Sequence, residues 1–263
     1  MDSTPLGSKT PNGAKASNGL KEGPMADIKF TDKIEIKLMQ CTASDASVIA
    51  AARASTLGAD SVESLTKDPN EAAGLINYLL KNRHGTPFEH NSFTFYVRAP
   101  IFVYREWHRH RVGWSYNEES GRYKELLPEF YLPSVERNLV QSGKPGHYEY
   151  KPGTKEQYEE LAKRLKKSYA EGYEAYKANL DAGIAREVAR MCLPVATMSS
   201  MYATCNARSL MHFLSLRTEH NDAAFPSHPQ REIAMAADQM EAIFAEKMPL
   251  TYEAYVKNGR VAP

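Results

Sequence analysis

The residues between Arg105 and Tyr123 are those of this chain best suited to chemistry. This segment holds four arginines, two histidines, three glutamates and four aromatic residues. A core excludes charged side chains unless each has a partner, whereas tryptophan and tyrosine favour partial burial. The mixture indicates a pocket for an anionic, planar ligand, in which guanidinium groups bind phosphate and aromatic rings stack. An ion-paired surface segment is the alternative interpretation.

A second candidate segment runs from Asn206 to Arg217. On a helix, Arg208 and His212 share one face at a spacing of four residues, and Asn206 and Arg217 return to nearly the same angle. The residues between them are apolar almost all round, so we expect a buried helix whose arginines need an anion, such as a bound phosphate or a ring with negative charge. The alternative is ion pairing with acids elsewhere in the chain, for which the candidates are Glu187, Glu219 and Glu232.

Arg109 and Arg111 are expected at the end of a helix that begins at Pro100. Neighbouring residues step by ~100° around a helix axis, so these arginines would point roughly opposite ways. They could then serve two ligands, or one ligand and a neighbouring subunit. Arg105 would share a face with Arg109, and their like charges repel unless an anion lies between them. A carboxylate could also fill that place, with the candidates Glu106, Glu118 and Glu119.

Other chemistries have weaker support in the sequence. Arg190 is either a ligand contact or an accessory to a surface pair of Arg186 and Glu187. His108 and His110 form only His-x-His, and neither His-Glu-x-x-His nor Cys-x-x-Cys occurs, so no metal is expected. Ser120 lacks the Gly-x-Ser-x-Gly pattern of a nucleophile elbow. The cysteines are too few for a disulfide framework, and we expect them reduced and buried in a cytoplasmic protein: Cys41, Cys192 and Cys205.

The composition is that of a globular protein. The chain has 263 residues, of which 42% are hydrophobic and 25% are charged, with a net charge of +1. These values exclude wholesale disorder and argue against binding of nucleic acid by bulk positive charge. No apolar run approaches the ~18 residues of a membrane span. Residues 1–26 are polar and predict a disordered leader, which leaves residues 27–263 as one domain.

The elements that must position these residues follow from periodicity. Alternation predicts strands over Ile34–Cys41 and Ser92–Arg98, whereas Val112–Gly153 is expected to be mostly loop. Without a regular alternation of strands and helices, the pattern favours an α+β fold with an antiparallel sheet flanked by helices. No Gly-x-Gly-x-x-Gly follows a strand, so a dinucleotide would not be held in the Rossmann manner. Apolar spacing and cap residues predict helices over Ser44–Ser55, from Asp68 to near His84, Pro100–His110, Lys155–Ala182, Ile184–Cys192, Asn206–Glu219 and Gln230–Lys247.

Several of these segments together resemble the flavin-dependent thymidylate synthases. Arg109-His110-Arg111 followed by Ser120-Gly121-Arg122-Tyr123 is similar to the signature of that family. The family pattern places seven residues between these two motifs, whereas Val112–Glu119 makes eight, and Gly113 could absorb the extra residue. Further similar segments follow in order over roughly residues 34 to 256: His84–His90, Pro100–Val103, Pro128–Pro133, Arg186–Arg190 and Asn206–Met211.

The resemblance implies an enzyme that makes dTMP from dUMP, with methylenetetrahydrofolate as carbon donor, FAD as hydride carrier and NADPH as reductant. It implies an α+β homotetramer with active sites shared between subunits, and neither a nucleic-acid nor a membrane partner. Arg217 would stabilise negative charge on the pyrimidine, which enriches C5 without a cysteine adduct. The rival hypothesis is a single-stranded nucleic-acid-binding protein that uses residues 105–123. A metal-dependent hydrolase is a more distant alternative.

The same resemblance implies a set of site residues. His84 is a candidate for the folate site, and Arg217 is the catalytic candidate. FAD would be held by Thr86, Arg109, His110, Arg111, Glu118, Asn206, Ala207, Arg208 and His212. The substrate would be held by Glu106, Trp107, His108, Arg109, Glu118, Glu119, Ser120, Gly121, Arg122, Arg190 and Arg217.

Overall fold

The computed structural model describes residues 27–58, 60, 69–144 and 147–263, and the predicted leader lies outside them. The fold is α+β with an antiparallel sheet and helices, as predicted. The elements run in the order β1 (Lys29–Thr31), β2 (Glu35–Cys41), α1 (Asp45–Leu57), α2 (Pro69–Lys81), η2 (Thr86–Glu89), β3 (Phe93–Pro100), α3 (Ile101–Trp107), β4 (Trp114–Glu118), β5 (Glu129–Tyr131), β6 (Asn138–Lys144), β7 (His147–Pro152), α4 (Lys155–Asp181), α5 (Arg186–Ala189), η3 (Arg190–Cys192), β8 (Met198–Cys205), α6 (Ala207–Arg217), α7 (Arg231–Lys247) and α8 (Pro249–Lys257).

The main sheet has four strands in the order β2-β3-β8-β4, and every pairing in it is antiparallel. The alternation predicted for β3 is confirmed, because Phe93, Phe95 and Val97 are fully buried. The adjacent strand β8 is missing from the prediction. Its residues include Ser199 and Ala203, which are buried but give little hydrophobic signal.

The prediction of loop for Val112–Gly153 is wrong in part. β4 pairs with β8, with Trp114 opposite Cys205 and Glu118 opposite Met201. β5 pairs in parallel with β1, and β6 pairs with β7 in a separate two-stranded sheet. β4 is short and none of its residues is buried, so its pairing partner rather than its own sequence makes it a strand.

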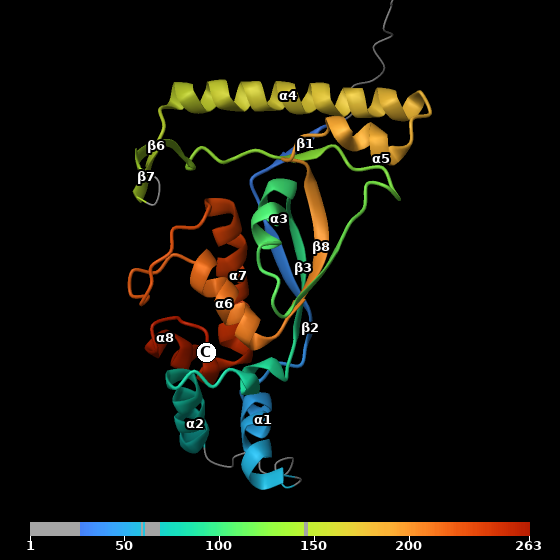
Figure 1. The fold of residues 1–263 in the computed structure, drawn as a ribbon. Coiled ribbons are helices and arrows are strands. Elements are labelled where there is room, and N and C mark those ends of the chain that lie inside the picture. The colour runs from blue at the N-terminus through green and yellow to red at the C-terminus, as the bar shows by residue number, and fades with distance from the viewer. Residues whose placement is uncertain (1–26, 59, 61–68, 145–146) are drawn as a thin grey trace, which may run out of the picture.

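Helices α6 and α7 lie along one side of the sheet, and α1 and α2 lie at the end near the C-terminus (Figure 1). The rings of Phe93 and Phe95 stack at 5.8 Å, and Phe244 from α7 meets Phe93 edge-on at 6.3 Å. All three rings are fully buried, so truncation of one of them to alanine would cost about 3–5 kcal/mol of stability. Of the two cap candidates in the sequence, Ser44 and Asp45, the structure selects Ser44, whose side chain accepts a hydrogen bond from the Ser47 amide.

The long helix α4 crosses the opposite end of the molecule above α5 (Figure 1). Thr154 caps its start, and Gly183 follows its end with a φ of +78°, which confirms the predicted stop. Tyr169, Tyr173 and Tyr176 are its buried tyrosines, and they belong to a second, smaller apolar cluster with Phe130 of β5. This cluster fixes α4 and α5 relative to the strands. None of the helices in the described part of the chain is long and apolar enough to span a membrane.

Candidate functional site

Arg109, His110 and Arg111 lie in a turn after α3, because that helix ends at Trp107. The prediction that the helix reaches His110 is therefore wrong, and the 100° argument for diverging arginines no longer applies. The His108 amide donates to the Tyr104 carbonyl, the Arg109 amide to Glu106 and the His110 amide to Trp107. The spacing of these bonds shortens from four residues to three, so the helix ends in a 3₁₀-type turn. The side chains of Arg109 and Arg111 are exposed, and neither makes a hydrogen bond or ion pair within the described ranges.

The guanidinium of Arg217 is held on three nitrogens at the end of α6. Its Nε donates to His110 Nε2 at 3.0 Å, and its Nη1 donates to Glu106 Oε2 at 3.0 Å. Its Nη2 donates to the Glu106 carbonyl at 3.2 Å. The Arg217 side chain is only 16% exposed. The expectation of an arginine without an adjacent acid is thus wrong for Arg217, because the end of α3 brings Glu106 to it.

Asn206, Arg208 and His212 line a cavity of about 460 Å³ at the start of α6. Asn206 caps the helix by accepting from the Ser209 amide at 2.8 Å, and the Ala207 amide donates to Asn91 at 2.9 Å. Ser209 of α6 also lines it, and the other lining residues come from three separate segments of the chain: Glu89, Val112, Gly113, Ala262 and Pro263. The structure therefore brings together three of the residues that the resemblance assigns to FAD.

Arg208 is half-exposed rather than buried, which corrects the expectation of a buried arginine in α6. Its Nη1 donates to Glu89 Oε1 at 2.5 Å, and its Nε donates to the Pro263 carbonyl group at 2.7 Å. A Cβ built on Gly85 would lie 2.6 Å from the Arg208 Cζ, so the guanidinium rests directly on this glycine. Glu89 was not among the acids considered from sequence, although it lies within the segment His84–His90 that carries part of the resemblance.

Gly113 lets the turn after α3 close onto α6. Its φ is +69°, and a Cβ built there would lie 2.2 Å from Ser209 Oγ. Only glycine fits at this position without displacing α6 or the turn. The Ser209 hydroxyl in turn donates to the Val112 carbonyl at 2.9 Å. The placement supports the expectation that Gly113 accommodates the extra residue of the segment.

Ser120, Gly121, Arg122 and Arg190 form a second group, beside α5. Arg122 Nε lies 3.0 Å from Glu187 Oε2, and a Cβ built on Gly121 would lie 3.2 Å from Arg190 Cδ. Glu187 therefore pairs with Arg122 rather than with the arginines of α6. Arg190 is half-buried and makes no ion pair with any described residue, which leaves its guanidinium available to an anion.

Glu118 and Glu119 are fixed by β8. Ser199 Oγ donates to Glu118 and Ser200 Oγ donates to Glu119, each at 3.0 Å. Glu119 also pairs with Lys124 at 2.8 Å. Neither acid pairs with Arg105 or Arg109. Among the described residues, Glu106 is the only one of the three candidate acids that pairs with a predicted site arginine.

The remaining predicted site residues differ in how far their side chains are exposed to solvent. His84 and Thr86 are exposed near the start of η2, and the His108 ring is exposed with an edge contact to Tyr116 at 5.0 Å. Trp107 is fully buried and stacks on Phe213 at 4.9 Å, so only its backbone could touch a substrate. Ala207 is likewise fully buried in the first turn of α6.

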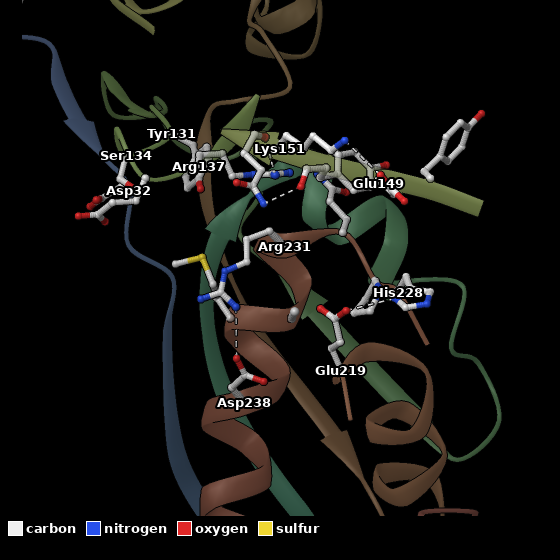
Figure 2. Close-up of a pocket in the computed structure, with 18 residues that line it drawn as sticks. Asp32, Tyr131, Ser134, Arg137, Glu149, Lys151, Glu219, His228, Arg231 and Asp238 are labelled. Carbon is white, nitrogen blue, oxygen red and sulfur yellow. Dashed lines mark hydrogen bonds and ion pairs between the residues drawn. The ribbon is translucent and has the colours of Figure 1, made fainter. Parts of the chain in front are cut away.

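A larger cavity of about 1200 Å³ lies between the β6–β7 hairpin and the start of α7 (Figure 2). None of the residues predicted for the site lines it. Its basic side chains already face acids, as Figure 2 shows for the pair of Arg231 with Asp238 at 3.5 Å and of His228 with Glu219 at 3.1 Å. Arg137 is paired too, with Glu232 at 2.9 Å. Because none of the predicted site residues lines this cavity, we do not place the substrate there.

The cysteines differ from one another in burial. Cys205 is 2% exposed at the end of β8, and burial raises the pKa of its thiol. Cys192 is exposed, so the expectation that it is buried is wrong, and Cys41 is half-buried. A thiol with a raised pKa carries little thiolate, which makes Cys205 a poor nucleophile. The described residues contain no group of three or more potential metal ligands.

The fold is thus α+β, and the side chains of Arg109, Arg111 and Arg190 have no acidic partner among the described residues. Residues 37–250 match the family described as "Thymidylate synthase complementing protein". The flavin-dependent thymidylate synthase of Streptomyces avermitilis is 56% identical over 246 residues, which cover 93% of this chain and 100% of that protein. That of Streptomyces coelicolor is 58% identical over 236 residues, which cover 90% of this chain and 96% of that protein. The chain therefore belongs to the flavin-dependent thymidylate synthase family.

Solved structures agree with this assignment. The UMP/dUMP methylase PolB from Streptomyces cacaoi bound with 5-Br dUMP is 51% identical and superposes with a TM-score of 0.85, over 90% of this chain and 100% of that one. The same methylase bound with 5-Br UMP gives 50% identity and a TM-score of 0.83, over 90% of this chain and 99% of that one. The family resemblance of the sequence and the α+β fold are thus both confirmed.

Proposed function

We propose that this enzyme converts dUMP to dTMP, with methylenetetrahydrofolate as the carbon donor, FAD as the hydride carrier and NADPH as the reductant. Membership of the family supports the reaction class. The observation that carries the proposal is Arg217, a little-exposed guanidinium held by Glu106 and His110 with two N–H groups left over. Such a fixed pair of donors suits the polar edge of a pyrimidine.

The pyrimidine C5 is a weak nucleophile, so the enzyme must make it more electron-rich. A positive charge beside the ring stabilises negative charge on the pyrimidine and acts more strongly where water is excluded. Arg217 provides that charge without a covalent adduct, in keeping with the buried Cys205. We assign Arg122 and Arg190 to the substrate phosphate, because Arg122 follows Gly121 and the Arg190 side chain passes close to that glycine.

The cavity at the start of α6 fits the anionic part of FAD. Arg208 and His212 line this space and can donate to phosphate oxygens. Arg109 and Arg111 are exposed on the adjoining turn without partners in the described part of the chain, so their charges are available to the dinucleotide. FAD, when bound, supplies hydride chemistry. These residues would hold its phosphates.

The family resemblance implies a homotetramer with shared active sites, and the surface around α5 and η3 supports an interface there. Five large apolar side chains are exposed in this region, of which Met191 at 78% and Tyr123 at 80% are the most exposed. Monomeric proteins seldom expose such contiguous apolar surface. The others are Ile184, Val188 and Val195. Light scattering at assay concentration should show an oligomer, and a fully active monomer would contradict the shared site.

The purified protein should be yellow, with a flavin spectrum that bleaches when NADPH is added. It should then form dTMP from dUMP when methylenetetrahydrofolate is present. UMP must be assayed in parallel, because the methylase PolB has been solved with both 5-Br UMP and 5-Br dUMP. A preference for UMP would change the substrate but keep the reaction class. A colourless protein that binds single-stranded nucleic acid in a salt-sensitive way would instead support the rival hypothesis.

A further inference from the structure

The His110 side chain is turned inward, toward α6. Its residue is only 6% exposed, and its Nε2 is the acceptor of the Arg217 Nε–H at 3.0 Å. Arginine has donors but no acceptor, so this contact requires an unprotonated Nε2. The ring must then be the neutral tautomer with its proton on Nδ1. The resemblance assigns His110 to FAD, whereas the structure directs this nitrogen to Arg217.

The surroundings of His110 keep it neutral. The Phe213 ring lies edge-on at 4.8 Å and the His212 ring at 6.2 Å, and Tyr116 donates its hydroxyl to the His110 carbonyl at 2.5 Å. Burial, then the charge of Arg217 and then His212, lower the pKa of His110 to about 4. At neutral pH the ring is therefore an acceptor that cannot repel Arg217.

Glu106 completes the arrangement from the other side of the guanidinium. Its carboxylate and its carbonyl take one donor each from Nη1 and Nη2 of Arg217. An arginine has five N–H groups, and three of them are now used by the protein. One N–H on each terminal nitrogen is left. These two donors lie in one plane, and the Nε contact to His110 fixes the rotation of that plane.

We propose that His110 is a positioning residue, which fixes the plane of the Arg217 guanidinium so that its two remaining N–H groups meet a pyrimidine edge. This inference rests on the proposed function, in which Arg217 acts on the pyrimidine. Glu106 alone would hold the two terminal nitrogens but would leave the guanidinium free to tilt about them. Misplacement of a catalytic group by about 1 Å can reduce a rate by about 100-fold.

Two matched variants separate positioning from packing. His110→Leu introduces an apolar side chain of similar volume that has no hydrogen-bond acceptor. His110→Gln instead provides a side-chain carbonyl that can accept from Arg217 Nε. We expect His110→Leu to lower the kcat of methyl transfer about 10- to 100-fold, with KM for dUMP changed much less. NADPH-driven flavin reduction and flavin content should stay within about twofold of the wild type. His110→Gln should recover most of the lost kcat.

A spectroscopic measurement makes the test independent of turnover. In protein labelled with ¹⁵N-arginine, the Arg217 Nε–H signal should be protected from exchange in the wild type and in His110→Gln, and should lose that protection in His110→Leu. Arg217→Lys identifies the signal by removing it. Unchanged protection and unchanged kcat in a folded His110→Leu variant would overturn the inference. Equal losses of kcat and of flavin in both variants would also overturn it, in favour of packing or flavin binding.

The failure of the proposed function would look different. A wild-type enzyme that binds flavin but methylates neither dUMP nor UMP would refute the reaction. The exchange measurement would still show whether His110 holds Arg217. The two claims can therefore fail separately.

Discussion

Arg122 Nε lies 3.0 Å from Glu187 Oε2, which ties the loop after β4 to the short helix α5. Both side chains are more than half exposed, so the pair itself contributes little stability, about 0–1 kcal/mol. Its effect is geometric. It fixes the Arg122 side chain beside α5, and the Arg190 side chain passes close to the neighbouring Gly121, so arginines from two distant segments lie in the same region.

Arg122→Ala should raise KM for dUMP about 10- to 100-fold, because a charged hydrogen bond to phosphate contributes about 1.5–3 kcal/mol. Glu187→Ala is the matched control, since it removes the partner of Arg122 but leaves the cation in place. It should change KM by less than about threefold. Steady-state kinetics with dUMP as the varied substrate measures both. A larger effect of the control would mean that Glu187, not Arg122, contacts the substrate.

Arg217→Lys keeps the positive charge but loses the planar set of donors that Glu106 and His110 hold. We expect dTMP formation to fall far more than NADPH-driven flavin reduction, by about 100-fold against less than about threefold. Stopped-flow reduction and product assays on the same preparation compare the two. Parallel losses in both steps, or no loss in either, would show that Arg217 does not act on the pyrimidine.

Arg111→Ala should weaken FAD binding about 10-fold or more, because this exposed arginine adjoins the cavity at the start of α6. Arg186→Ala is a suitable control, since Arg186 is exposed at the start of α5 and has no proposed contact to the flavin. Fluorescence titration of the apoprotein with FAD gives both affinities. Equal affinities for the wild type and Arg111→Ala would remove Arg111 from the flavin site.

A variant with Cys41, Cys192 and Cys205 replaced by alanine should still convert dUMP to dTMP. Cys205 is buried with a raised thiol pKa, so it is poorly suited to attack a pyrimidine. We expect lower stability, by about 1–2 kcal/mol, from lost packing at Cys205. Turnover is measured with saturating FAD, folate and NADPH. If a folded variant that retains flavin made no dTMP, a cysteine nucleophile would replace the mechanism proposed above.

The pH dependence of stability should reveal the buried His110. Its pKa is about 4 in the folded protein, below the ordinary 6.5, so the unfolded chain takes up the proton first as the pH falls. The stability that the neutral ring supports is complete above about pH 6.5 and is lost progressively toward pH 4. That loss amounts to on the order of 3 kcal/mol. Urea unfolding at several pH values should show that the free energy of unfolding falls more steeply with decreasing pH in the wild type than in His110→Gln. The same pH dependence in both proteins would contradict this prediction.

Several elements could be predicted because their signals are local. The strict alternation of β3, the cap at Ser44 and the end of α4 at Gly183 each depend on neighbours within a few residues. The α6 helix was predicted for the same reason. Its degree of burial was not, since one face of the helix, with Arg208 and His212, remains exposed.

The strands β4 and β8 could not be predicted in the same way. β8 lies between β3 and β4, so its backbone is satisfied from both sides and its side chains can be small or polar. β4 is a strand because its backbone pairs with the remaining free side of β8. Both strands depend on pairing between distant segments. The end of α3 at Trp107 likewise depends on a distant contact, because the turn that follows must bring Gly113 against Ser209.

The sequence by itself determined the family, the α+β class and the kinds of residue that bind an anion, because motifs and periodicity are written in neighbouring positions. Only the tertiary structure decided the partners of the arginines. Arg217 meets Glu106 across 111 positions, and Arg208 meets Glu89 across 119. Ion pairs are short-ranged contacts, and which acid comes within reach depends on how the helices and strands pack rather than on the spacing along the chain.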